Sequence, residues 1–191
     1  EELEALVFAP WQAEYGRRVE LGREADWQQH LDRLRQQSHC QIDDLDLLAA
    51  WFAPYGDQLA TLPGASEALA NLGKSGLKVA LVSNVPLPGE LYLRVLRRYG
   101  LVESFDHFVF SYDAGSRKPS PAMLRQAMAA IDAEPAETIM VGDRRDRDIV
   151  AGRLAGNRTI WIRSDDGGGP EPDSTLDSLA GLPQLLDVWE R

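Results

Sequence analysis

Apolar side chains in the first sixty residues recur every three or four positions, which is the spacing of one face of an α-helix. They are Leu3, Val7, Trp11, Tyr15, Val19, Trp27, Leu31, Leu34, Leu45, Leu48, Trp51 and Phe52. Gly22, the polar stretch 38–44 and Pro54 interrupt this pattern and mark the expected helix ends. The sequence therefore predicts a small all-helical domain over residues 1–60.

From residue 61 onward, short apolar runs typical of strands alternate with helical patterns. Strands are predicted at 77–82, 107–110, 138–141 and 158–162, and helices at 65–72, 91–99, 121–131, 149–155 and 179–189. Residues 164–174 are rich in Gly, Pro and Asp, and we expect a surface loop there. Because helical crossovers join strands that pair in parallel, residues 61–191 are predicted to form an α/β domain with a doubly wound parallel sheet.

The acidic balance of the chain argues against two classes of partner. Its 20 Lys and Arg against 30 Asp and Glu give a formal net charge of -10 over 191 residues. Proteins that bind nucleic acid or an anionic membrane surface carry a basic stripe instead. No apolar run approaches the roughly 20 residues of a membrane span, and Cys40 has no partner for an internal disulfide. We expect a cytoplasmic protein that binds neither nucleic acid nor membrane.

Three residues suited to phosphate chemistry follow predicted strands. Ser83 and Asn84 come after the strand at 77–82, where a hydroxyl and backbone N–H groups could hold a phosphoryl oxygen. Lys118 lies in the loop after the next strand and carries a point charge that can neutralise a phosphate or a carboxylate. Taken singly, Ser-Asn is an ordinary turn and Lys118 an ordinary solvated lysine.

Two carboxylates follow the predicted strand at 138–141. Asp143 comes directly after it, and Asp148 lies five residues later at the start of a helical pattern. Asp143 could simply cap that helix, but Mg²⁺ also accepts one or two carboxylates and keeps several waters. The carboxyl ends of parallel strands share one edge of a sheet, so we expect all these residues to line one crevice.

The order and spacing of these segments resemble the haloacid dehalogenase-like hydrolase superfamily. Ser83 with Asn84 is similar to its second motif, Lys118 within 117–121 to its third, and the stretch 142–148 to its fourth. The helical first sixty residues resemble the small cap that such proteins insert after their first strand. The resemblance implies an aspartyl nucleophile, a phosphoaspartyl intermediate, Mg²⁺, and a cap that excludes water from the crevice.

The resemblance also implies a function. We expect an Mg²⁺-dependent phosphohydrolase acting on a small phosphorylated metabolite, with Ser83, Asn84 and Lys118 as catalytic residues and Asp143 and Asp148 as the metal site. A phosphomutase shares this core and stays an alternative, as does a 2-haloacid dehalogenase, although members that displace halide need no metal. Substrate identity and oligomeric state are set by features that this sequence does not specify.

The first motif of the family, Asp-x-Asp after a strand, is missing from this sequence. Asp44 and Asp46 have its spacing but stand at the start of a helical pattern, and Asp146 with Asp148 belongs to the fourth motif. Residues 5–8 could be a degenerate first strand, with Ala9 in the place of the nucleophile. We expect instead that the first core strand and its aspartates lie upstream of Glu1, which is not an initiator Met. The alternative is a noncatalytic binding or regulatory relative.

Overall fold

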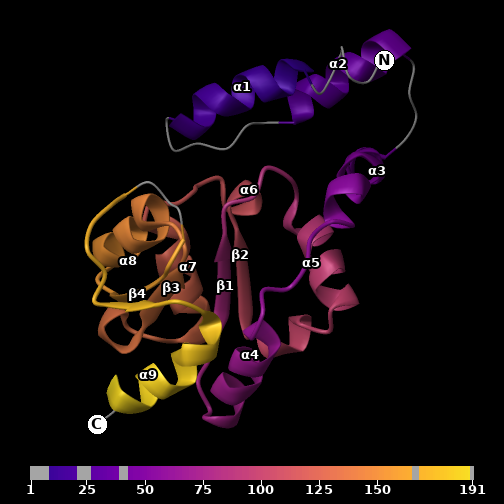
Figure 1. Cartoon of the computed structure of the whole chain (residues 1–191). Helices are drawn as coiled ribbons and strands as arrows, with labels where there is room; N and C mark the ends of the chain where they lie inside the picture. The colour runs from indigo at the N-terminus through magenta and orange to yellow at the C-terminus, as the bar shows by residue number, and fades with distance from the viewer. Residues whose placement is uncertain (1–8, 21–26, 39–42, 165–167, 190–191) are drawn as a thin grey trace.

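The computed structural model describes residues 9–20, 27–38, 43–164 and 168–189 (Figure 1). The helices are α1 (Ala9–Glu20), α2 (Gln28–Ser38), α3 (Asp44–Gly56), α4 (Ala65–Lys74), α5 (Gly89–Arg98), α6 (Ser111–Ala114), α7 (Ala122–Ile131), α8 (Val150–Ala155) and α9 (Leu182–Trp189). The strands are β1 (Ala80–Ser83), β2 (His107–Phe110), β3 (Ile139–Gly142), β4 (Arg158–Ile162) and β5 (Ser174–Leu176). Shorter turns are η2 (Val102–Ser104), η3 (Pro135–Glu137), the π-helix η4 (Arg145–Ile149) and η5 (Leu179–Gly181).

The described part of the chain before residue 60 is helical, as the apolar spacing predicts. α3 begins where the carboxylate of Asp43 accepts a hydrogen bond of 2.8 Å from the backbone N–H of Leu45. Trp11 and Trp27 are buried and stacked, with 4.2 Å between their ring centroids, and their cluster includes Leu87 and Leu91. These helices therefore share a core with the residues that follow β1. The division into domains at residue 60 stays a prediction.

The strands form two parallel sheets. β1 pairs with β2, with Ala80 opposite His107, and β3, β4 and β5 pair in that order, with Ile139 opposite Arg158. The α/β class with parallel pairing is thus confirmed. Within the described residues, β1 and β3 do not pair with each other, so the two sheets are separate.

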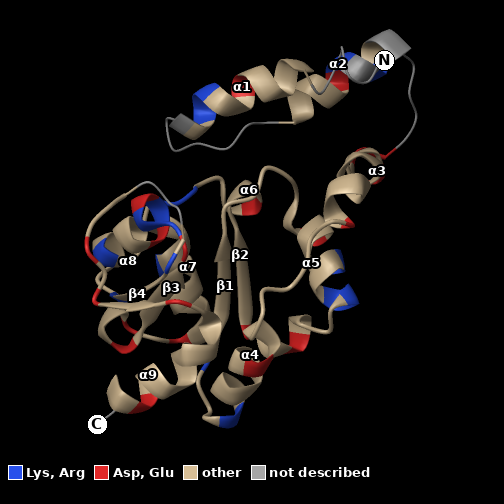
Figure 2. Ribbon diagram, viewed as in Figure 1, with Lys and Arg blue, Asp and Glu red and all other residues tan. Residues whose placement is uncertain are grey.

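Helices pack against both faces of the strands, and all residues of β1 and β3 are half-buried. On β3, Met140 packs with α7 and α8, whereas Ile139 and Val141 pack in the cluster that contains Leu72 of α4 and Leu182 of α9. Figure 1 shows α7 and α8 near β3 and β4, with α4 and α9 at the far end of the molecule from α1 and α2. β1 and β2 carry no Lys, Arg, Asp or Glu and are wholly tan in Figure 2.

Two of the differences from the prediction have a local reason. β1 begins at Ala80 rather than Leu77, because the N–H of Val79 donates to the carboxylate of Asp106 at 2.7 Å. β5 falls at the end of the expected loop and just beyond it, and a polar, three-residue strand gives little periodic signal.

Asp173, just before β5, forms hydrogen bonds with Thr159 on β4, and these bonds predict that the stability of the protein depends on pH. One oxygen of Asp173 accepts hydrogen bonds of 2.7 Å from both the hydroxyl and the backbone N–H of Thr159. The hydroxyl bond outweighs the desolvation that opposes it and lowers the pKa of Asp173 below its ordinary value. A lowered folded-state pKa contributes stability that is full above the ordinary value and is lost as the pH falls through the folded value.

We therefore expect the stability difference between the wild type and Asp173→Asn to shrink below about pH 4, in urea unfolding followed from pH 7 downward. The difference at neutral pH is about 1 kcal/mol or less, because the Asp173 side chain is exposed. A difference that is constant across the acid range would contradict this role.

Candidate active site at the carboxyl ends of β1 and β3

Lys118 is a buried cation held from two sides. Its ammonium group donates to the carbonyl of Val82 on β1 at 2.7 Å and lies 2.7 Å from Oδ1 of Asp148 in η4. The side chains of Lys118 and Asp148 are 10% and 6% exposed, so the pair is largely withdrawn from solvent. A charged ammonium that is fixed in this way can offset negative charge at a defined point. This ion pair joins the two sheets near their carboxyl ends.

Asp148 reaches this position through an unusual turn. The carbonyl of Arg144 accepts hydrogen bonds from the backbone N–H groups of Arg147, Asp148 and Ile149. This pattern forms the π-helical turn η4, which leads into α8. In return, Oδ2 of Asp148 accepts a hydrogen bond of 3.0 Å from the N–H of Arg144. A Cβ at Gly142 would lie 2.3 Å from that oxygen, so only glycine lets the carboxylate pack on the end of β3. π-helical turns of this kind often mark functional sites.

Ser83 and Asn84 lie at the end of β1, as predicted. The side chain of Asn84 bonds the backbone of Lys118 twice, donating from Nδ2 to its carbonyl at 2.9 Å and accepting at Oδ1 from its N–H at 2.8 Å. The structure thus brings Asn84, Lys118 and Asp148 into one hydrogen-bonded group. Ser83 is half-buried beside this group, at the last position of β1.

Asp143 directly follows β3 and its side chain is exposed. Its backbone carbonyl accepts hydrogen bonds from Trp161 at 3.0 Å and from the hydroxyl of Ser164, which fixes the main chain. Its carboxylate makes no hydrogen bond or ion pair within the described residues. An exposed carboxylate that projects from a fixed main chain at a strand end fits a ligand of Mg²⁺.

The remaining ligands of such an ion would come from elsewhere. Within the described residues, no group of three or more His, Cys, Asp or Glu side chains is arranged to hold a metal. Mg²⁺ needs only one or two carboxylates when waters and phosphate oxygens complete its shell, so Asp143 fits without such a group. Asp148, predicted as a second metal residue, has both oxygens engaged by Lys118 and Arg144. Its assignment to the metal stays a prediction.

A cavity of about 840 Å³ lies between β1 and β3. Residues 79–83 and 138–141 line it from the two strands, with α7 on one face and α4 and α9 on the other. In the described part of the chain, β1 pairs only with β2 and β3 only with β4, so each strand turns an unpaired edge toward the cavity. We refer to this cavity as the interstrand slot. Backbone N–H and C=O groups on such edges need partners when they are buried.

Two contacts of the site were missed by the sequence analysis. Arg117, beside Lys118, is only 3% exposed, and its guanidinium lies 5.4 Å from the ring centroid of Tyr15 in α1 and donates to its hydroxyl at 3.3 Å. Trp27 Nε1 donates to the carbonyl of Pro86 at 2.7 Å. Both contacts join the residues before α3 to the loops at the carboxyl end of β1, and Figure 1 shows α1 above α6. Only the position of Arg117 next to Lys118 could have suggested either contact.

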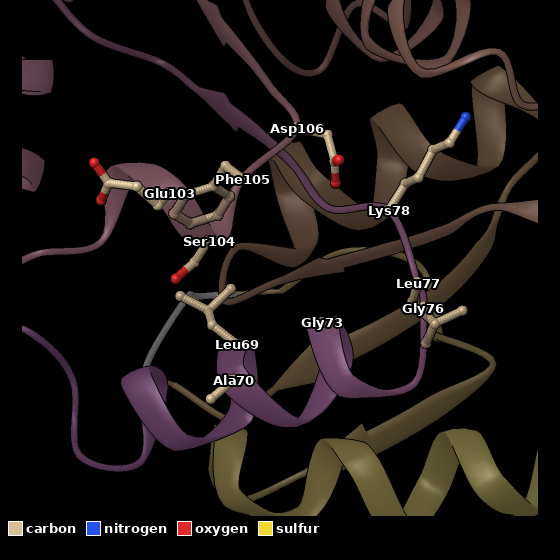
Figure 3. Close-up of a pocket in the computed structure, with 10 residues that line it drawn as sticks. All are labelled: Leu69, Ala70, Gly73, Gly76, Leu77, Lys78, Glu103, Ser104, Phe105 and Asp106. Atoms are coloured by element: carbon tan, nitrogen blue, oxygen red, sulfur yellow. The ribbon is translucent and has the colours of Figure 1, made fainter.

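A second hollow of about 380 Å³ lies at the other end of β1 (Figure 3). α4 and residues 103–106 line it, together with the chain that enters β1. Two of its polar side chains are used internally: Lys78 donates to the carbonyl of Ile131 at 2.6 Å, and Asp106 accepts from the N–H of Val79. Because it opens at the amino end of the strand, this hollow is separate from the residues around Lys118.

Comparison with known proteins agrees with this geometry. A family model described as haloacid dehalogenase-like hydrolase matches residues 1–156. Among curated relatives, glyceraldehyde 3-phosphate phosphatase of Pyrococcus furiosus is 33% identical over 138 residues, which is 70% of this chain and 56% of that protein. The chain thus spans little more than half the length of this relative.

Solved structures show the same fold. A phosphatase from Thermococcus onnurineus aligns with a TM-score of 0.64 at 24% identity, over 80% of this chain and 68% of that one. A 2-haloacid dehalogenase from Pseudomonas syringae aligns with a TM-score of 0.59 at 26% identity, over 69% of this chain and 55% of that one. In the described residues, no helix is long and apolar enough to cross a membrane.

Proposed function

Because the chain belongs to the haloacid dehalogenase-like hydrolases, we propose that it acts as an Mg²⁺-dependent phosphohydrolase on a small phosphorylated metabolite. The observation that carries this proposal is the buried ammonium of Lys118, fixed between the carbonyl of Val82 and the carboxylate of Asp148. A phosphoryl group gathers negative charge on its oxygens as it is transferred, and a fixed cation stabilises that charge. The names of curated relatives, such as the glyceraldehyde 3-phosphate phosphatase, support the same reaction class.

The proposed reaction has two steps. A carboxylate oxygen of an aspartate bonds to phosphorus while the bond from phosphorus to the leaving oxygen breaks, and a second aspartic acid gives that oxygen its proton. Water then bonds to phosphorus and gives a proton to the second aspartate, which restores its acid form, while the aspartyl oxygen leaves and inorganic phosphate is released. Ser83 and the backbone N–H of Asn84 hold phosphoryl oxygens during both steps, and Lys118 offsets their charge.

Asp143 would hold the metal ion, with Asp148 supporting the site through its pair with Lys118. When bound, Mg²⁺ supplies charge stabilisation at the phosphoryl oxygens. The helices before residue 60 act in this proposal as a cap that keeps bulk water from the crevice. Their contacts through Tyr15 and Trp27 to the loops around Lys118 support that role.

We propose further that the two aspartates of the reaction lie on a strand N-terminal to Glu1 that occupies the interstrand slot. The slot supports this idea because two unpaired strand edges face it and helices close it on both faces. A parallel strand there would satisfy both edges, and its carboxyl end would emerge between Ser83 and Asp143. If no such strand exists, the chain is a noncatalytic relative that keeps the pocket.

The proposal is tested by phosphate release from p-nitrophenyl phosphate. We expect the chain extended by its natural N-terminal sequence to release phosphate with Mg²⁺ and to lose that activity with EDTA. We expect Asp143→Asn to lower kcat/KM at least about 100-fold, because a metal ligand is lost. Asp187→Asn, the same change at an exposed position of α9, is the control and should keep full activity.

Other outcomes discriminate among the alternatives. Equal activity of Asp143→Asn and the wild type would refute the metal assignment. Halide release from a 2-haloacid without Mg²⁺ would favour a dehalogenase, and retention of the phosphoryl group on the product would favour a mutase. A natural protein that starts at Glu1 and releases no phosphate would be the noncatalytic relative.

A further inference from the structure

The side chain of Asn84 engages both backbone polar groups of one distant residue. Its Nδ2 donates to the carbonyl of Lys118 and its Oδ1 accepts from the N–H of the same residue, at 2.9 Å and 2.8 Å. The two bonds fix the orientation of the amide, because the flipped form would set oxygen against oxygen and N–H against N–H. Both ends of the Asn84 amide are therefore already used by the protein.

Both the backbone and the side-chain ammonium of Lys118 are consequently held by residues at the end of β1. Asn84 holds its backbone, and the carbonyl of Val82, two residues earlier, accepts from its ammonium at 2.7 Å. A free lysine side chain samples many rotamers, so the position of its charge is undefined unless the backbone and the ammonium are both held. The end of β1 thus sets the direction in which the Lys118 side chain runs.

The segment that carries Asn84 is itself fastened to the end of β2. The hydroxyl of Ser111 accepts from the N–H of Val85 at 2.8 Å and donates to the carbonyl of Val85 at 3.1 Å. Ser111 is fully buried. A little further on, the carboxylate of Asp113 accepts from the N–H of Gly89 at 3.1 Å. The Asn84 amide therefore projects from a rigid support, which a positioning role requires.

We propose that Asn84 is a positioning residue: its side chain sets the place of the Lys118 ammonium and makes no contact with the substrate. This inference rests on the proposed function for its effect on catalysis, but the hydrogen bonds behind it do not. It assigns to the Asn84 side chain a task different from the phosphate contact expected of its backbone N–H. One N–H of Nδ2 and Oδ1 are both bonded to the backbone of Lys118, so the amide cannot rotate toward a phosphoryl oxygen without breaking both bonds.

Two substitutions separate the hydrogen bonds from packing. Asn84→Leu keeps a side chain of similar size without polar atoms, and Asn84→Ala removes both the volume and the bonds. Asn71→Ala on α4 is the matched control, since it truncates an asparagine far from Lys118 in the fold. Thermal unfolding establishes a temperature at which all variants are folded.

The first readout needs no catalysis. In protein labelled with ¹⁵N-lysine, a hydrogen-bonded, buried ammonium exchanges its protons slowly and gives a resolved NMR signal, assigned here by its loss in Lys118→Met. We expect this signal to broaden or vanish in Asn84→Ala and Asn84→Leu and to persist in Asn71→Ala. A signal unchanged in both Asn84 variants overturns the inference, whether or not the protein proves to be a phosphatase.

The second readout is kinetic and uses the extended chain with p-nitrophenyl phosphate and Mg²⁺. We expect both Asn84 variants to lose about 10- to 100-fold in kcat with little change in KM, because a misplaced charge acts mainly in the transition state. A rise in KM at constant kcat would show instead that Asn84 contacts the substrate. Absence of activity in the wild type would refute the proposed function and leave the NMR result to decide this inference.

Discussion

Replacing Lys118 by Met is expected to abolish nearly all phosphatase activity, with a loss of about 100- to 1000-fold in kcat/KM. Methionine keeps the apolar stem of the side chain and removes the charge that lies between Val82 and Asp148. The variant should also be less stable by about 3–5 kcal/mol, because the buried carboxylate of Asp148 then lacks its counter-charge. Urea unfolding of the same preparations measures this second effect.

A double variant separates the two effects. Lys118→Met combined with Asp148→Asn leaves no buried charge at the site, and a neutral pair of similar volume is often about as stable as an ion pair. We expect it to recover most of the lost stability and none of the lost activity. If the double variant were as unstable as the sum of the two single variants, Lys118 and Asp148 would not be energetically coupled.

Replacing Gly142 by Ala is expected to have the second-largest effect. The new Cβ would lie 2.3 Å from Oδ2 of Asp148 and 2.4 Å from its Cβ. Oδ2 is held by the N–H of Arg144, and the Cβ is attached directly to the main chain, so neither atom can move freely. Asp148 must therefore move, and the Lys118 ammonium moves with it. We expect a loss of about 1–3 kcal/mol in unfolding free energy and at least about 10-fold in kcat.

Gly73→Ala provides the contrast. This glycine lies in α4, its φ is ordinary for a helix, and a Cβ added there would meet nothing within 4 Å. Alanine at this position should stabilise the chain by about 0.5–1 kcal/mol and leave kcat unchanged. If Gly142→Ala behaved like Gly73→Ala, the close packing of Asp148 on β3 would not constrain the site.

Periodicity was sufficient to predict most helices and strands after residue 61. The strands at 107–110 and 158–162 have the predicted bounds because each is a short run rich in β-branched or aromatic residues with clear ends. β5 was missed because it is short and polar, and its place depends on the contact of Asp173 with Thr159 rather than on its own residues. Contacts of this kind carry no local signal.

For the site, the residue types indicated the chemistry and the structure revealed the partners. The candidate site residues could be selected from the sequence because each comes after a predicted strand; they are Ser83, Asn84, Lys118, Asp143 and Asp148. The sequence could not show that Asp148 pairs with Lys118, because a π-helical turn and a glycine on β3 decide where that carboxylate points. Nor could it show that Arg117 contacts Tyr15, since 102 residues separate them.

The interstrand slot has a consequence for how the protein behaves in solution. Unpaired strand edges are templates for pairing between molecules, and natural sheets usually protect them. The edges of β1 and β3 are flanked by apolar side chains and carry no charged residue that would discourage such pairing. The strand that we propose for the interstrand slot would therefore affect solubility as well as catalysis, and we expect a preparation without it to self-associate through its own sheet edges.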